Sequence, residues 1–221
     1  MPTLGAYPRL PDLETLPVTD APRPLRPLLA ADVERLASRA AEGEPSARIE
    51  LAHATAAAVV EVGRAESDPG DRLVRLADTV GLDTLAELWQ SAAPDSLPGA
   101  LWALYLLRTW CTENGAEVAR LYRTGRSLAP VDEVVAGVHS DADPEAVASL
   151  ADTVLTGLYG GDLGVALERG AAFFRVVAAG RLFLADDGPD GEAERERAGR
   201  NRSRADALAR AATAWRAGTL H

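Results

Sequence analysis

The sequence predicts an all-α protein, a single-domain multi-helix bundle around two buried apolar helices at about 97–112 and 162–184. Along most of the chain, apolar residues recur at spacings of three and four, which is typical of helices that bury one face. Proline, glycine and capping residues separate these stretches and mark where helices start and stop. No stretch alternates between apolar and polar residues for long enough to indicate a strand, so we expect no sheet.

Residues 1–27 form a proline-rich segment that we expect to be an extended arm. Seven of the fourteen prolines lie here, and proline fixes φ and biases the preceding residue toward extended conformations. The segment also carries spaced apolar residues that a plain linker would not need: Leu4, Tyr7, Leu10, Leu13, Leu16, Val18 and Leu25. Two interpretations stay open: a disordered tail, or an arm that lies in a groove of its own body or of a second subunit.

Four helices are predicted between the arm and residue 95, and each ends at a residue that breaks helices. Gly43, Pro69, Gly81 and Pro94 supply these breaks. The predicted ranges are 27–42, 47 to about 66, 71–80 and 83–89. The second of these helices has a face of alanines, which would let a neighbouring helix approach closely.

The first apolar helix is predicted to have no side that faces water. Ser96 or Asp95 can accept hydrogen bonds from the free N–H groups of the first turn, and Pro98 has no N–H to leave unpaired there. The apolar residues that follow occupy two opposed sides of the helix: Leu101, Trp102, Leu104, Tyr105, Leu106 and Trp110. A membrane span needs about 20 apolar residues, but a guanidinium arrives at Arg108. We therefore expect a core helix.

Three shorter helices, at 116–122, 131–138 and 145–158, precede the second apolar helix. Asp162 caps that helix, and its character resembles that of the first, with Leu163, Leu167, Phe173, Phe174, Val176 and Val177. The last predicted helix, 192–215, is polar and has a narrow stripe of Ala198, Ala205, Leu208, Ala212 and Trp215. The predicted organisation is an arm at 1–27, a helical core domain at 28–186, and a C-terminal polar amphipathic helix at 187–221 that packs on the core or on a partner.

Composition excludes several classes of function. The formal net charge is −10 and the 23 basic residues are all arginine, while the isoelectric point is near 4.8. An acidic chain is poorly suited to general binding of nucleic acid or anionic membranes, so neither partner is expected. The only cysteine, Cys111, excludes an internal disulfide and a multi-thiolate metal site. No charged region followed by an apolar run opens the chain, and we expect a cytoplasmic location.

Three motifs suggest chemistry, and each is incomplete. Glu50 and His53 form one Glu-x-x-His half-motif, but a di-iron bundle needs it twice with two more carboxylates. The loop at 139–145 combines His, Ser and Asp residues, which neither meet as a triad nor supply the ligand spacing of a calcium loop. The Gly160-Gly161 turn lacks the preceding strand and the lysine of a phosphate-binding loop. We therefore expect no catalytic residue, no metal and no cofactor.

The arginines within the apolar helices are the best candidates for a site. Arg108, Arg169 and Arg175 interrupt surfaces that are otherwise apolar, and a buried guanidinium must be paired. One interpretation pairs them with nearby carboxylates: Glu168, Glu117, Glu87 or Asp78. The other has them converge with Tyr105 and Trp102 on a cleft that binds an anionic small ligand.

Two functions follow from these observations. The first is a helical interaction protein that forms a homo-oligomer or binds a protein partner through its N-terminal arm and C-terminal helix. The second is a small-molecule-binding bundle, or an enzyme, that uses the arginine-lined cleft. The sequence itself offers no reaction.

Overall fold

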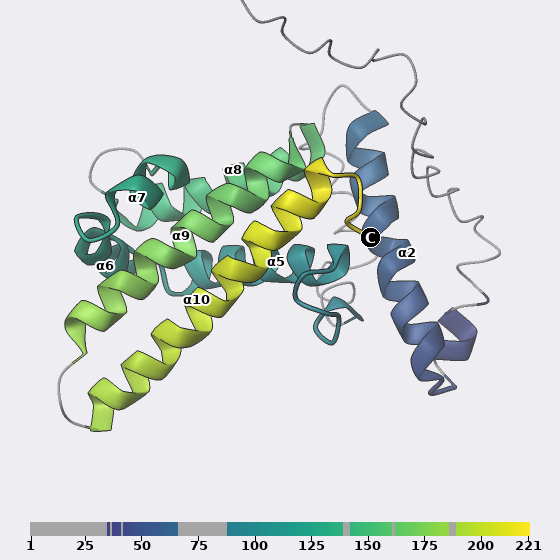
Figure 1. Ribbon diagram of the computed structural model, residues 1–221, viewed down its shortest axis with the longest axis horizontal. Helices are drawn as coiled ribbons and strands as arrows, with labels where there is room; N and C mark the ends of the chain where they lie inside the picture. Colours follow the sequence, from purple (N-terminus) through teal and green to yellow (C-terminus); the bar gives the residue numbers. More distant parts are fainter. Residues whose placement is uncertain are drawn as a thin grey trace, which may run out of the picture.

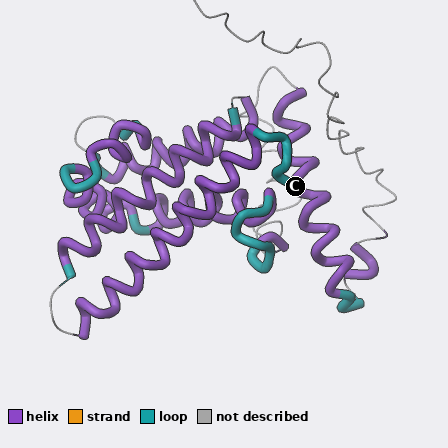
Figure 2. Tube along the Cα trace, viewed as in Figure 1, coloured by secondary structure: helices purple, strands orange, loops and turns teal. Residues whose placement is uncertain are grey.

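The computed structural model describes residues 35, 37–40, 42–65, 88–138, 142–160, 162–185 and 189–221. Every regular element within these ranges is an α-helix, as Figure 2 shows. The prediction of an all-α bundle is therefore confirmed. The helices whose bounds are described are α2 (Pro45–Ala65), α5 (Leu97–Glu113), α6 (Gly115–Arg126), α7 (Pro130–Ala136), α8 (Pro144–Gly160), α9 (Leu163–Leu184) and α10 (Pro189–Arg216).

Helix α9 is the element around which α5, α6, α7, α8 and α10 pack. Its N-terminus is capped by Asp162, whose Oδ1 accepts a hydrogen bond from the N–H of Gly164 at 2.8 Å. Leu167 and Phe173, which point to different sides of the helix, are both fully buried. A helix that is apolar all round needs neighbours all round, and α9 contacts α5, α6, α7, α8 and α10.

Helix α5 is the second apolar helix, but it is buried on one side only. Ser96 caps it by accepting a hydrogen bond from the N–H of Gly99 at 3.3 Å. Leu101 and Leu104 are buried, whereas Trp102 and Leu106 are half-buried. The expectation of a helix with no water-facing side is therefore too strong for α5, because none of the described helices covers its outer face fully.

Helix α10 runs antiparallel to α9 along nearly its whole length (Figure 1). Ion pairs lie at the two ends of this helix pair: Arg216 reaches Glu168, and Arg181 reaches Glu194. The α10 residues that face the interior form what we call the α10 row: Glu194, Ala198, Asn201, Ala205, Leu208 and Ala212. From Ala198 onward every member of this row is buried, so the apolar stripe of α10 is covered by its own chain.

Several predicted boundaries shift in the structure. Helix α6 continues to Arg126 instead of ending near residue 122, because Gly125 still packs against α9. Helix α10 begins at Pro189, three residues before the predicted start. The predicted arm at 1–27, the predicted helix at 71–80, most of the one at 83–89, and both predicted domain boundaries lie outside the described residues.

Candidate functional site

Arg108 and the two aromatic residues predicted beside it lie on the less buried side of α5. The Nε atom of Arg108 donates a hydrogen bond to Oδ1 of Asp152 on α8 at 2.9 Å, and both side chains are exposed. Trp102 and Tyr105, three residues apart, stack on each other with ring centroids 5.5 Å apart. Arg108 is thus engaged by a carboxylate at the surface.

Arg169 and Arg175 on α9 both reach α7. The Nε atom of Arg169 donates to the carbonyl oxygen of Ala136 at 3.3 Å. Arg175 donates from Nη1 to Oδ1 of Asp132 at 3.3 Å, and its Nη2 lies 3.8 Å from a carboxylate oxygen of Asp206 on α10. Because Arg108 faces α8 while these two face α7, the contacts of the three guanidinium groups do not meet at one point.

The carboxylates that the sequence offered as partners serve other arginines. Glu117 pairs with Arg181, and Glu168 pairs with Arg216. The other two, at positions 78 and 87, lie outside the described residues. Arg108 and Arg175 form ion pairs, but with Asp152, Asp132 and Asp206, which were not the partners named. Arg169 donates to a backbone carbonyl instead.

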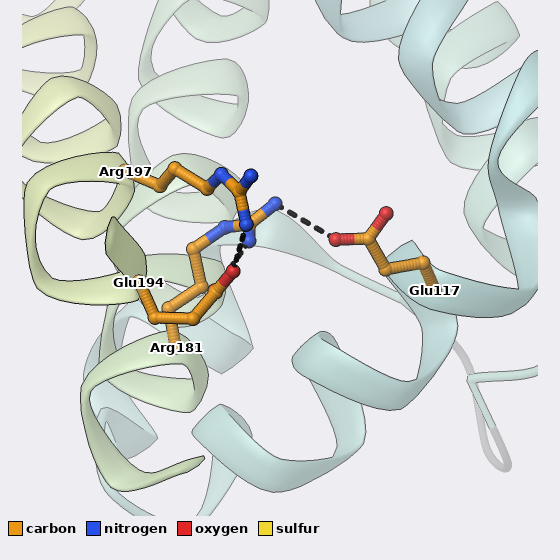
Figure 3. A network of polar contacts seen from close by, with 4 residues as sticks. All are labelled: Glu117, Arg181, Glu194 and Arg197. Carbon is orange, nitrogen blue, oxygen red and sulfur yellow. Dashed lines mark hydrogen bonds and ion pairs between the residues drawn. The ribbon is translucent and has the colours of Figure 1, made fainter. Parts of the chain in front are cut away.

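Among the described residues, the most buried arginine is Arg181, near the end of α9, and Figure 3 shows its surroundings. Only 6% of Arg181 is exposed, and it donates to Glu194 of α10 at 2.6 Å and to Glu117 of α6 at 3.0 Å. Its guanidinium carbon lies 5.2 Å from the ring centroid of Trp110 on α5. Arg197 reaches the other oxygen of Glu194. One guanidinium therefore connects four helices, α5, α6, α9 and α10.

The charge balance of this cluster favours the ionised form of Glu194. Burial raises the pKa of Glu194, but hydrogen bonds from Arg181 and Arg197 lower it by more, so the pKa lies below its ordinary value. The Nε atom of Arg181 is buried and has no hydrogen-bond partner within the described part of the chain. The arrangement holds helices together and exposes no reactive group.

A second polar group lies further along the α10 row. Asn201 is 5% exposed, and its Nδ2 atom finds no hydrogen-bond partner among the described residues. One turn later, Arg204 is half-buried. Burial, and then the like charge of Arg200, lower the pKa of Arg204. Arg200 itself is paired with Glu196.

Helix α7 presents apolar side chains to solvent. Val131 and Val134 are 76% and 75% exposed, and Leu128 and Val135 are also exposed. Spacings of three, three and one between these four residues place them on one side of α7 and of the turn before it. We call these residues, Leu128, Val131, Val134 and Val135, the α7 stripe. The opposite side of α7 packs on α9 through Ala136, which is fully buried.

Cys111 and Tyr122 are buried ionisable groups without a reactive setting. Burial, with a smaller contribution from Asp152, raises the pKa of the Cys111 thiol to about 12. Burial, followed by the charge of Glu133, raises the pKa of Tyr122 to about 12. Since a nucleophilic cysteine needs a lowered pKa, Cys111 acts as an apolar core residue.

The half-motif at His53 lies on α2, near the residue at the end of the sequence. Burial and the charge of His221 lower the pKa of His53, and the carbonyl oxygen of His221 accepts a hydrogen bond from the N–H of Leu97 at 3.2 Å. In the described ranges, no group of three or more His, Cys, Asp or Glu residues is arranged to bind a metal ion. The loop at 139–141 lies outside those ranges.

The sequence carries a signal for the burial of Arg181 and of Asn201 that the predictions above did not include. On α9, Arg181 continues a row with alternating spacings of three and four, made of Leu167, Gly170, Phe174 and Val177. On α10, Asn201 fills the seven-residue interval between Ala198 and Ala205 in the predicted stripe. A polar residue in phase with a buried row is itself expected to be buried.

No family model matches the chain, and neither a curated protein nor a solved structure matches it. Among the described helices, none combines the length and the apolar character needed to cross a membrane.

Proposed function

We propose that this protein is a helical interaction module that associates with a second copy of itself through the α7 stripe. The observation that carries the proposal is the exposure of Val131 and Val134, at 76% and 75%. Burying apolar surface is the main driving force of association. An exposed apolar stripe in phase along a helix is the usual docking face for another helix.

The charges around α7 favour a second copy as the occupant. Asp132 and Glu133 lie in the first turn of α7. Asp132 is already paired with Arg175 of α9, and Arg169 reaches the carbonyl oxygen of Ala136 in the last turn. In a two-fold symmetric pair, antiparallel α7 helices place the acidic end of each copy beside the basic end of the other. The helix dipole, negative at its C-terminus, is compensated by the same arginine. Apolar contact and charge thus favour the same arrangement.

Helix α10 and the arm have different places in this proposal. The α10 row is covered by α9 and α5 within the chain. We therefore propose that the main contact with the second copy is made by α7, and not by α10 as the sequence suggested. The proline-rich arm, outside the described residues, remains a proposed second contact. The acidic net charge of −10 supports a protein partner over nucleic acid or an anionic membrane. A cytoplasmic location is part of the proposal, and cell fractionation would test it.

The test is the oligomeric state of Val134→Arg by analytical ultracentrifugation at micromolar to high-micromolar concentration. We expect the unchanged protein to dimerise with increasing concentration, and the variant to remain a monomer because a buried unpaired charge opposes association. Ile49→Arg is the matched control, since Ile49 is also exposed, at 60%, but belongs to α2. A protein that stays monomeric throughout, or a control that dissociates as fully as Val134→Arg, contradicts the proposal.

The charge arrangement has its own test. Glu133→Arg and Arg169→Glu should each weaken the dimer at low salt, and the double variant should regain part of the lost affinity because both charges are exchanged. Circular dichroism checks that each variant is folded. If removal of residues 1–27 dissociates the dimer while Val134→Arg does not, the contact belongs to the arm and the α7 proposal is wrong.

A further inference from the structure

We propose that α10 carries a binding site for a carboxylate-bearing small molecule, formed by the side-chain amide of Asn201 and the guanidinium of Arg204. This site is separate from the α7 stripe. It also differs from the predicted cluster of Arg108, Arg169 and Arg175, because contacts within the chain engage each of those three.

The inner part of the site is Asn201. Its side chain is 95% covered, since 5% of the residue is exposed, yet its Nδ2 donor has no hydrogen-bond partner in the described ranges. A buried donor without a partner is destabilising, and buried polar side chains nearly always have a partner. The amide is therefore placed to donate to an acceptor that is not supplied by the described part of the chain.

The outer part of the site is Arg204. Three residues separate it from Asn201, so the two side chains share one side of α10. Arg204 is half-buried and makes no hydrogen bond or ion pair within the described chain, unlike Arg197 and Arg200, which are bound to Glu194 and Glu196. Burial and the like charge of Arg200 lower the pKa of Arg204. A negatively charged acceptor would stabilise the buried guanidinium of Arg204 and offset its repulsion from Arg200.

The chemistry of the two donors selects the ligand. A guanidinium offers two parallel N–H groups that match the two oxygens of a carboxylate, and the Asn201 amide adds a third donor. Only one positive charge is uncompensated here, because Glu196 already engages Arg200. A single negative charge balances it, which favours a monocarboxylate over a phosphate dianion. The half-buried Arg204 keeps the site reachable from solvent while Asn201 forms its inner end.

The test is thermal unfolding of the full chain with acetate, butyrate, benzoate or inorganic phosphate, compared with chloride at equal ionic strength. A bound monocarboxylate at about 100 times its Kd should raise Tm by about 5–10 °C. Arg204→Gln should abolish the shift. Arg202→Gln is the matched control, because it removes the same charge from an exposed position of α10 and should retain the shift.

A second variant keeps the inference testable if Arg204→Gln unfolds. Asn201→Leu replaces the unpaired amide by an apolar side chain of similar size, so the protein should stay folded and lose the carboxylate-dependent shift. Three results would overturn the site: no carboxylate raises Tm above chloride, phosphate alone raises it, or both arginine variants reduce the shift equally. These outcomes do not depend on the oligomeric state, so they leave the α7 proposal unaffected.

Discussion

Helix α9 packs against α6 and against α10 in different ways. Against α6 the two backbones nearly touch, because a Cβ at Gly180 would overlap the carbonyl oxygen of Leu121, and one at Gly125 would overlap that of Val176. Against α10 the contact is made through side chains, including Leu208, which lies beside Gly170, and Arg181, which pairs with Glu194. The α6–α9 contact depends on glycines that have no side chain, whereas the α9–α10 contact depends on apolar packing and an ion pair.

The difference matters for where the protein can hold polar groups. Where the glycine backbones meet, no side chain fits between α9 and α6, and Glu117 of α6 pairs with Arg181 one turn before Leu121. The α9–α10 contact accommodates Arg181 with Glu194, and Asn201 two turns from Glu194 along the same row. We therefore expect the α6 side to respond to added volume, and the α10 side to respond to lost charge or changed pH.

The largest effect is expected from Arg181→Met. This change removes the shared partner of two carboxylates, Glu117 and Glu194, and leaves Glu194 partly buried with less compensation. Breaking a buried ion pair on one side costs about 3–5 kcal/mol, measurable as a lower urea midpoint with an unchanged m-value. Arg216→Met is the control, since its pair with Glu168 is exposed and should cost at most about 1 kcal/mol. Equal losses would mean that Arg181 is no more than a surface pair.

Gly180→Ala tests the α6 side with a single added methyl group. The new Cβ meets the rigid carbonyl of Leu121, so the helices must separate, at a cost of about 1–3 kcal/mol. Gly199→Ala is the matched control, because nothing lies within 4 Å of the added Cβ on α10. There the same change should stabilise the helix by about 0.5–1 kcal/mol. Opposite signs for the two variants support the close contact, and equal signs contradict it.

The smallest effect is the pH dependence of the α10 side. The pKa of Glu194 is lowered in the folded protein, so its contribution to stability is present above the pKa of the unfolded chain and is lost as pH falls through the folded value. Glu194→Gln should therefore lose less stability than the unchanged protein between pH 7 and about 3. Glu196→Gln, at an exposed pair with Arg200, should keep the original pH dependence. Denaturant titrations at several pH values in this range measure the free energy of unfolding of each variant and of the unchanged protein.

The starts of the helices and their apolar phase follow from local chemistry, so the sequence determined them. Ser96 and Asp162 cap α5 and α9 as expected, since a side-chain oxygen needs only its own first turn to accept from. Helix boundaries that depend on tertiary contact differ from the predicted ones. Helix α6 is one turn longer than predicted because Gly125 packs on α9. A side-chain cap was therefore a sufficient local signal at Ser96 and Asp162, whereas the end of α6 and the start of α10 at Pro189 differed from the prediction.

Only the tertiary structure decided which polar residues are buried, and with what. The sequence singled out Arg108, Arg169 and Arg175, whose neighbours in the chain are apolar, but it did not single out Arg181. Burial of a guanidinium depends on which helices cover it, and the carboxylates that pair with Arg181 come from positions 64 residues before it and 13 after it. The outward direction of the α7 stripe has the same cause. A short amphipathic pattern fixes which residues share a side, while packing against α9 selects the side that faces water.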